Sequence, residues 1–127
     1  IYPCSPFLTP KDLIQASIQF KQDNFSNCLM AVTDYPAPIE WAFEINQEGI
    51  LNPINEGFFK IRSQDLKKKY YDAGTFYIYN KDYLIKSIYT GSDKNFTPYF
   101  LLKNKAIDID DMQDWEFAEK LYKIDKK

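Results

Sequence analysis

The spacing of apolar residues predicts that helices and strands alternate along the first third of the chain. Thr9 followed by Pro10 is typical of a helix start, and apolar residues recur at helical spacing to about residue 22. The run 27–34 is short, apolar and compatible with a buried strand. Residues 37–46 alternate between apolar and polar, which predicts a half-buried strand.

The same reading extends to the rest of the chain. The polar stretch 62–74 is interpreted as a short helix or a loop that ends at Gly74. Beyond it we expect strands at 75–80, 99–104 and 106–109 and helices at 81–89 and 112–124. Strands that alternate with helices predict an α/β sheet with a β-rich insertion in the middle.

Composition narrows the possible functions. The 127 residues suit one domain or part of one, and 45% hydrophobic residues are enough for a packed core. A net charge of −2 argues against a nucleic-acid surface, and the apolar runs are too short to span a membrane. The sequence has no histidine, which excludes Ser-His-Asp, Cys-His and His-based metal chemistry. Carboxylates, Lys, Arg, Tyr and an oxygen-bound cation such as Mg²⁺ remain.

The cysteines and the first residue indicate the cellular context. Cys4 and Cys28 lack metal-site spacing, so we expect two buried free thiols in a reducing cytoplasm. No signal peptide is visible, and the chain opens at Ile1 without an initiator Met. We therefore expect a cytoplasmic protein of which this chain is the C-terminal portion.

An acidic cluster precedes the last predicted helix. On a strand over 106–109, Asp108 and Asp110 would share one face while Ile107 and Ile109 pack on the other. Two carboxylates at the carboxyl end of a strand suit Mg²⁺, which keeps several waters and accepts phosphate oxygens.

The neighbouring aspartates have a simpler interpretation. Asp111 can cap the following helix, a contribution of roughly 1 kcal/mol, and Asp114 in its first turn favours the helix macrodipole. The alternative that all four aspartates are capping or solvated charge stays open. A buried stripe is expected on this helix at Met112, Trp115, Ala118 and Tyr122, with Leu121 beside it.

The segment Arg62–Leu66 lies between aromatic-rich stretches. Its Arg, Gln and Asp could form a surface that recognises an anion and hydroxyl groups, because a guanidinium binds a carboxylate through two parallel hydrogen bonds. Equally, it could be an exposed loop kept in solution by Lys67–Lys69.

Three motifs in order resemble a known family: "YPCSPFL", "RSQDLKKKYYDAGTFY" and "AIDIDDMQDWEFAEKLY". They resemble the CMP-sialic acid synthetases, and most of all the nonulosonic acid cytidylyltransferases that act on pseudaminic acid in bacteria that glycosylate their flagellins. The resemblance implies the C-terminal part of a Rossmann-like nucleotidyltransferase fold of the nucleotide-diphospho-sugar transferase type. It also implies a homodimer formed through a β-rich arm at 36–77.

The resemblance further implies a reaction and its residues. The anomeric hydroxyl of a nine-carbon sugar acid attacks the α-phosphate of CTP and releases pyrophosphate, with Mg²⁺ held by Asp108 and Asp110. The positions that match the family's sugar-binding segments are Arg62, Ser63, Gln64, Asp65, Asp72 and Gly74, together with Tyr2 and Ser5 of the cleft loop.

Departures from the family pattern matter as well. Ser63, Ala73 and Tyr2 stand where sialic acid synthetases usually have Arg, Asn and Gln, which points to a pseudaminic-type substrate; Arg62 is then expected to hold the sugar carboxylate. The family's basic, Gly-rich phosphate-binding loop is not in the sequence, so we expect the chain alone to be inactive. The alternatives are a CMP-N-acetylneuraminic acid synthetase, a metal-dependent glycosyltransferase with a DxD motif, and a non-catalytic oligomerisation module built on the aromatic centre.

Overall fold

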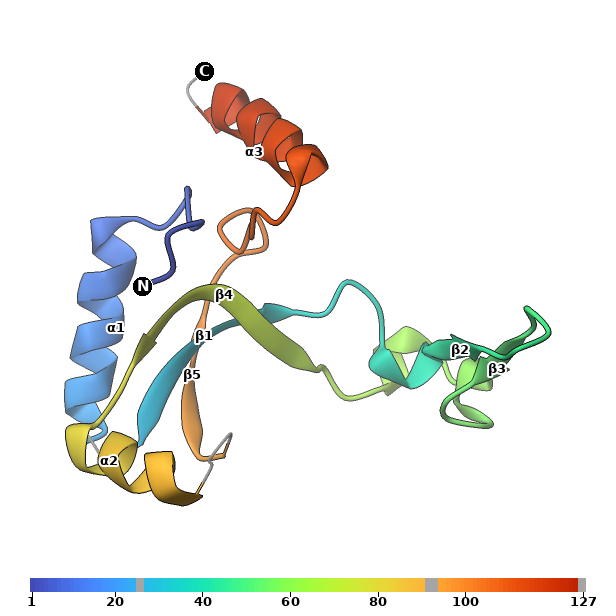
Figure 1. The fold of residues 1–127 in the computed structure, drawn as a ribbon, viewed down its shortest axis with the longest axis horizontal. Coiled ribbons are helices and arrows are strands. Elements are labelled where there is room, and N and C mark those ends of the chain that lie inside the picture. Colours follow the sequence, from blue (N-terminus) through green and yellow to red (C-terminus); the bar gives the residue numbers. More distant parts are fainter. Residues whose placement is uncertain (25–26, 91–93, 126–127) are drawn as a thin grey trace. The chain divides into compact units, whose positions relative to one another are not determined.

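A computed structural model describes residues 1–24, 27–90 and 94–125 (Figure 1). The chain divides into two compact units, Asp34–Tyr71 and the remainder, which comprises Ile1–Thr33 and Asp72–Lys127. The elements, in chain order, are α1 (Pro10–Gln22), β1 (Cys28–Asp34), η1 (Ile39–Trp41), β2 (Phe43–Ile45), β3 (Leu51–Pro53), η2 (Phe58–Lys60), η3 (Ser63–Asp65), β4 (Tyr70–Ile78), α2 (Lys81–Thr90), β5 (Phe96–Phe100) and α3 (Met112–Asp125).

A three-stranded sheet forms the centre of the first unit, in the order β4-β1-β5. β1 pairs with β5 in parallel, from Cys28 opposite Phe96 to Val32 opposite Phe100. Parallel strands need a crossover connection, and the connection from β1 to β5 includes β4 and α2. The expected α/β character is confirmed at this coarse level.

Helix α1 covers the core of this sheet, and its predicted range is confirmed. Thr9 and Asp12 form a capping box at its start, with Pro10 at the first helical position. Ala16 and Phe20 are buried against the sheet; the other buried residues of this core are Leu29, Ala31, Ala73, Phe76 and Leu101.

The strand predictions are confirmed in part. The strand at 27–34 corresponds to β1, and 75–80 falls largely within β4, which already begins at Tyr70. The polar stretch 62–74 therefore does not end at Gly74: it contains η3 and the first half of β4. The strand predicted at 99–104 instead occupies Phe96–Phe100.

The strand predicted at 106–109 is wrong. The segment has no regular structure, because β5 ends at Phe100 and none of the described strands pairs with the residues that follow. The predicted alternation of burial nevertheless holds, since Ile107 and Ile109 are half-buried while Asp108 and Asp110 are exposed.

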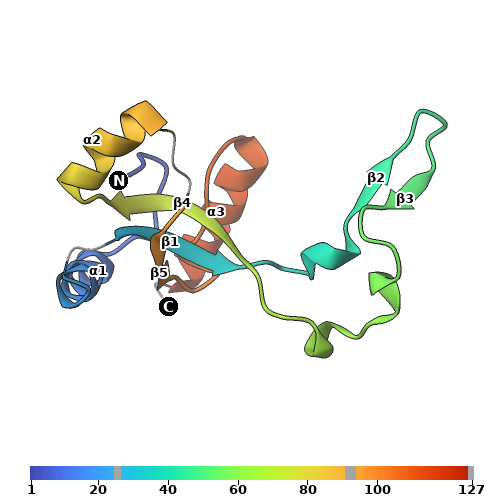
Figure 2. The same ribbon diagram turned by 90° about the horizontal axis from the view of Figure 1, so that it is seen from below.

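The second unit, Asp34–Tyr71, contains a small hairpin and three single turns. β2 and β3 pair antiparallel, and Figure 2 shows them side by side. The strand predicted at 37–46 is wrong over its first half, where Ile39–Trp41 forms a 3₁₀ turn. The reason lies in contacts with a distant part of the chain. The Trp41 indole N–H donates to the carbonyl of Phe58 at 3.1 Å, and its ring packs edge-on against that of Phe59. These tertiary contacts override the strand preference of the alternating pattern.

The buried stripe predicted on α3 is largely wrong. Ala118 is buried, but Met112, Trp115 and Tyr122 are 71%, 57% and 51% exposed.

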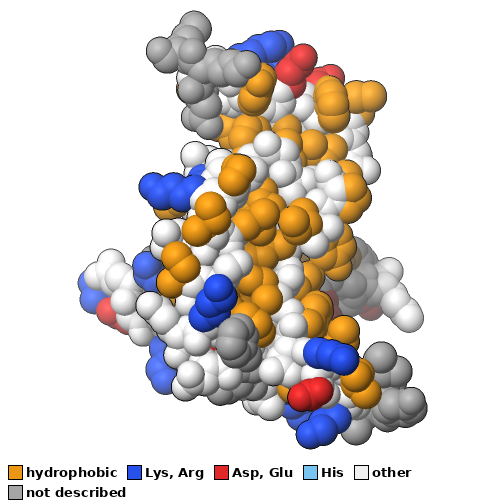
Figure 3. Space-filling view, turned by 90° about the vertical axis from the view of Figure 1, so that its left-hand side faces the viewer, with side chains coloured by type: hydrophobic (Ala, Val, Ile, Leu, Met, Phe, Trp, Pro, Cys, Tyr) orange, Lys and Arg blue, Asp and Glu red, His pale blue; other side chains and the backbone are white. Residues whose placement is uncertain are grey.

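The expectation of two buried thiols is half correct, since Cys28 is buried and Cys4 is exposed. Apolar side chains also gather in a broad band on the face drawn in Figure 3. Among the described helices, none is long and apolar enough to cross a bilayer.

Candidate functional site

The middle of β4 brings together predicted site residues from three parts of the first unit. Its centre is the backbone carbonyl of Thr75, which accepts a hydrogen bond from the Tyr2 backbone N–H at 2.8 Å. The Ser5 hydroxyl donates to the same carbonyl at 3.3 Å. The N-terminal loop, predicted to line a cleft, is thereby attached to β4 beside Gly74.

Asp108 lies directly against Gly74. A Cβ atom on Gly74 would stand 2.8 Å from Asp108 Oδ2 and 3.2 Å from its Cγ. Gly74 also has φ +61°, a left-handed conformation that side-chain-bearing residues rarely adopt. The glycine is required here for two reasons, the backbone conformation and the close approach of a carboxylate.

A phenol that the sequence did not single out completes this group. The Tyr77 hydroxyl donates to Asp72 Oδ2, and Asp72 Oδ1 accepts from the Gly74 backbone N–H at 3.0 Å. The Tyr77 ring packs against that of Tyr2, with centroids 5.8 Å apart. Burial raises the pKa of Tyr77, and the hydrogen bond and negative charge of Asp72 raise it further, so this phenol stays a donor.

The regular alternation of side chains on a strand does not predict the hydrogen bond between Asp72 and Tyr77. Residues five apart on a strand point to opposite faces, so the spacing alone predicts no contact. The left-handed Gly74 between them interrupts the alternation. A glycine inside an aromatic strand was the signal in the sequence that could have revealed this pairing.

Asp110 follows Asp108 by two residues and begins the network that starts α3. Its backbone N–H and that of Asp111 donate to Asp114 Oδ2 at 3.1 and 3.2 Å. Asp111 Oδ1 in turn accepts from the backbone N–H groups of Gln113 and Asp114 at 2.7 and 3.0 Å. The predicted capping role of Asp111 is confirmed. The side chains of Asp111 and Asp114 both accept hydrogen bonds from backbone N–H groups at the start of the helix.

The donor set limits which metal could bind. Among the described residues, no three Asp, Glu, Cys or His side chains converge as a cage. Asp108 and Asp110 remain as two exposed carboxylates near the start of α3. Mg²⁺ is the hard cation that binds through one or two carboxylates and takes its remaining ligands from water and substrate phosphates. The residues present fit that ion and do not fit a cation that needs a complete protein cage.

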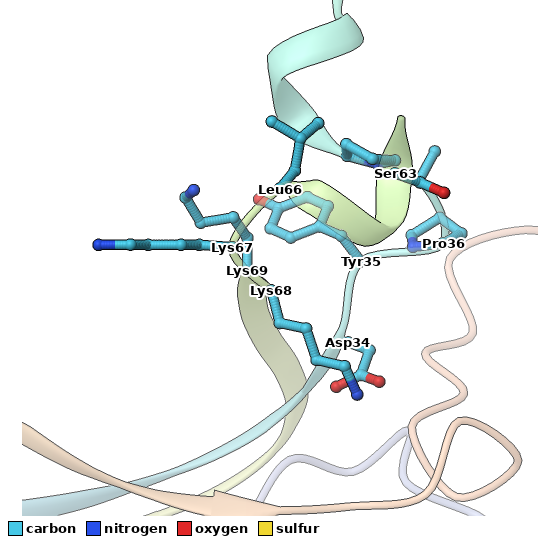
Figure 4. Close-up of a pocket in the computed structure, with 10 residues that line it drawn as sticks. Asp34, Tyr35, Pro36, Ser63, Leu66, Lys67, Lys68 and Lys69 are labelled. Atoms are coloured by element: carbon cyan, nitrogen blue, oxygen red, sulfur yellow. The ribbon is translucent and has the colours of Figure 1, made fainter. Parts of the chain in front are cut away.

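The other predicted residues lie in the second unit, around η3. Arg62 Nε is 3.1 Å from Asp65 Oδ2, and both side chains are largely exposed. Gln64 is exposed as well. Ser63 lines a hollow of about 170 Å³ with Tyr35, Leu66 and the lysines of 67–69, shown in Figure 4.

One of the lysines that line this hollow, Lys69, forms an ion pair with Glu40. Lys69 Nζ is 2.6 Å from Glu40 Oε1, a hydrogen bond that holds the pKa of Glu40 below its usual value. The charge of Lys69 is therefore paired with that of Glu40. For Lys67 and Lys68, no ion pair is found within the part of the chain that the structure describes.

Comparisons with known proteins identify the class. No protein-family profile matches the chain. Two curated proteins match it over 130 residues, which is 98% of this chain and 53% of each relative, with 37% and 36% identity. The chain spans about half the length of the curated relatives it matches.

The chain has a mixed α/β fold, and these two matches show that it is homologous to a nucleotidyltransferase family. More particularly, it is homologous to pseudaminic acid cytidylyltransferase, the name that both relatives carry. They come from Campylobacter jejuni subsp. jejuni strains 81-176 and NCTC 11168.

Proposed function

We propose that this chain is part of a cytidylyltransferase that transfers CMP from CTP to a nonulosonic acid, specifically pseudaminic acid. The anomeric hydroxyl oxygen forms the new bond to the α-phosphorus, the bond to pyrophosphate breaks, and the hydroxyl proton leaves to solvent. The observation that carries the proposal is 37% identity along 98% of the chain to a protein named for this activity.

The structure supports the proposal through the group around β4. The exposed Asp108 carboxylate lies against Gly74, next to Thr75, whose carbonyl anchors the Tyr2–Ser5 loop. We assign Mg²⁺ to Asp108 and Asp110, where a bound ion would offset charge on phosphate oxygens and lower the pKa of the attacking hydroxyl. Tyr77 keeps Asp72 oriented by donating a hydrogen bond to it.

In this proposal the second unit supplies four of the sugar-recognition residues, and Tyr2, Ser5, Asp72 and Gly74 belong to the first unit. Arg62, Ser63, Gln64 and Asp65 are exposed, and the Arg62–Asp65 pair leaves other guanidinium N–H groups available to a carboxylate. A homodimer formed through this unit belongs to the same proposal.

Product analysis tests the function. The full-length gene product is incubated with CTP, Mg²⁺ and a panel that includes pseudaminic and N-acetylneuraminic acid, and CMP-sugars are identified by mass spectrometry. We expect the CMP-sugar of pseudaminic acid to dominate. CMP-N-acetylneuraminic acid as the main product would contradict the substrate assignment, and no CMP-sugar from any acid would contradict the function.

A second experiment tests the acidic pair. Asp108→Asn and Asp110→Asn keep the side-chain shape and remove the charge, so turnover should fall roughly 100-fold with each. Asp82→Asn, an exposed aspartate in the first turn of α2, is the matched control and should retain full activity. If activity and Mg²⁺ dependence survive in both variants, the pair is no more than part of a helix start.

A further inference from the structure

The segment that carries Asp108 lies outside the sheet ladder, so other contacts must hold it. It leaves β5 at Leu101, whose backbone N–H donates to the carbonyl of Val32 at 2.9 Å. The buried Thr33 hydroxyl donates to the carbonyl of Leu101 at 3.1 Å. Its other end is the capped start of α3 at Asp111. Between these anchors the segment has no regular structure.

Lys105 provides an attachment in the middle of this segment. Its backbone N–H closes a turn onto the carbonyl of Leu102 at 2.8 Å, and its amino group reaches helix α1. There Nζ donates to both carboxylate oxygens of Asp12, at 2.8 and 2.7 Å. Ala106, the next residue, packs against the hydrophobic core. Asp108 follows two residues later.

The acceptor of this contact is held rigidly. Asp12 Oδ2 also accepts from the Thr9 backbone N–H at 3.0 Å and from the Thr9 hydroxyl at 2.5 Å. The Asp12 side chain is only 12% exposed and that of Lys105 27%. Because Ala16 and Phe20 anchor α1 in the core, the carboxylate is a fixed point for the lysine.

A comparison within the chain shows why this pair matters. Lys120 and Glu116 on α3 are 3.9 Å apart and 73% and 63% exposed, a geometry that contributes little. In the Asp12–Lys105 pair the amino group lies within 2.8 Å of both carboxylate oxygens, and the two side chains are partly shielded from water. Removal of one partner from a partly shielded pair leaves a charge with less compensation, and we expect the segment to relieve it by moving.

We propose that Lys105 is a positioning residue: its ion pair with Asp12 holds the segment 102–110 so that Asp108 stays against Gly74. This inference rests on the proposed function, in which Asp108 binds Mg²⁺ for nucleotidyl transfer. In this role Lys105 needs no contact with the substrate or the ion. It acts through Asp108.

The first measurement follows the order of the segment directly. Hydrogen–deuterium exchange of peptides covering residues 102–110 is compared between the full-length gene product and Lys105→Met, which keeps an apolar stem and removes the charge. We expect roughly tenfold faster exchange in Lys105→Met. Lys105→Arg, which can bind the carboxylate with two hydrogen bonds, should restore slow exchange. Lys120→Met is the matched control and should leave this segment unchanged. Lys105→Gln serves if Lys105→Met does not fold.

The second measurement links the segment to the metal. The Mg²⁺ concentration that gives half-maximal turnover should rise roughly tenfold in Lys105→Met, as for other residues that orient metal ligands, with a smaller change in the KM for the sugar. Lys105→Arg should return it to the original value.

The outcomes separate this inference from the proposed function. Unchanged exchange in Lys105→Met overturns the inference. Faster exchange with unaltered Mg²⁺ dependence also overturns it, because the pair is then structural only. If Asp108→Asn leaves the Mg²⁺ dependence unaltered, the proposed metal site fails, whatever Lys105→Met does to exchange.

Discussion

At the scale of single residues, Gly74 and Gly49 share a left-handed backbone, but only Gly74 faces a carboxylate. Their φ angles are +61° and +80°; a Cβ on Gly49 would meet nothing within 4 Å, whereas one on Gly74 would meet Asp108 Oδ2 at 2.8 Å. Both Gly→Ala variants should lose about 1–2 kcal/mol of unfolding free energy, measured in urea. Only Gly74→Ala should also lose turnover and raise the Mg²⁺ requirement. Equal activity in the two variants would show that the contact with Asp108 is immaterial.

Asp12 makes the stability of the first unit depend on pH. Burial raises its pKa, but hydrogen bonds from Lys105 and Thr9 outweigh burial and hold the pKa below its usual value. A carboxyl with a lowered pKa in the folded state adds stability above its unfolded pKa of about 3.9, and this stability is lost as the pH falls through the folded pKa. The free energy of unfolding is measured in urea for the unsubstituted protein and for Asp12→Asn. The difference between the two values should become smaller below about pH 4. A difference that stays constant down to pH 2 would contradict the assigned cause.

At the scale of elements, the start of α3 offers a test of local capping. Asp111 Oδ1 accepts from two backbone N–H groups that have no partner within the helix. Asp111→Ala should therefore cost about 1 kcal/mol of unfolding free energy and speed amide exchange in the first turn. Glu116→Ala, one turn further on an exposed face, is the control and should change stability by no more than a few tenths of that amount. An identical effect of both variants would exclude a specific cap.

Elements defined by neighbouring residues could be predicted from the sequence. Helix α1 was predicted at 10–22 because Thr9 and Pro10 define its start and apolar residues follow at helical spacing. The strand at 106–109 was not correct, because alternation gives the faces of a segment but does not supply a pairing strand. The metal hypothesis used both the shared face and the end of a strand. The strand is absent, while the exposure of Asp108 and Asp110 is as the alternation indicated.

At the scale of the whole molecule, burial was harder to predict than secondary structure. The apolar stripe on α3 has helical spacing, yet Trp115 and Tyr122 are more than half exposed. Spacing identifies an apolar face but not the surface that covers it. The contact of Gly74 with Asp108 joins residues 34 apart and could not be read from either segment alone. For the same reason Tyr77 was seen only as one of many aromatic residues.

The charge of CTP leads to a prediction about the chain as a whole. A triphosphate needs several cations or backbone N–H groups around it, often from a Gly-rich loop. This sequence has one arginine, Arg62, which the proposed function assigns to the sugar carboxylate, and four glycines that lie apart from one another. The 127-residue chain should therefore bind CTP weakly and form no CMP-sugar, while the full-length gene product does both. Calorimetric titration with CTP and a turnover assay, on samples whose circular dichroism shows folded protein, provide the test. Steady CMP-sugar formation by the 127 residues alone would mean that the lysines of this chain hold the triphosphate, and that the phosphate-binding half of the proposed reaction has been assigned to the wrong residues.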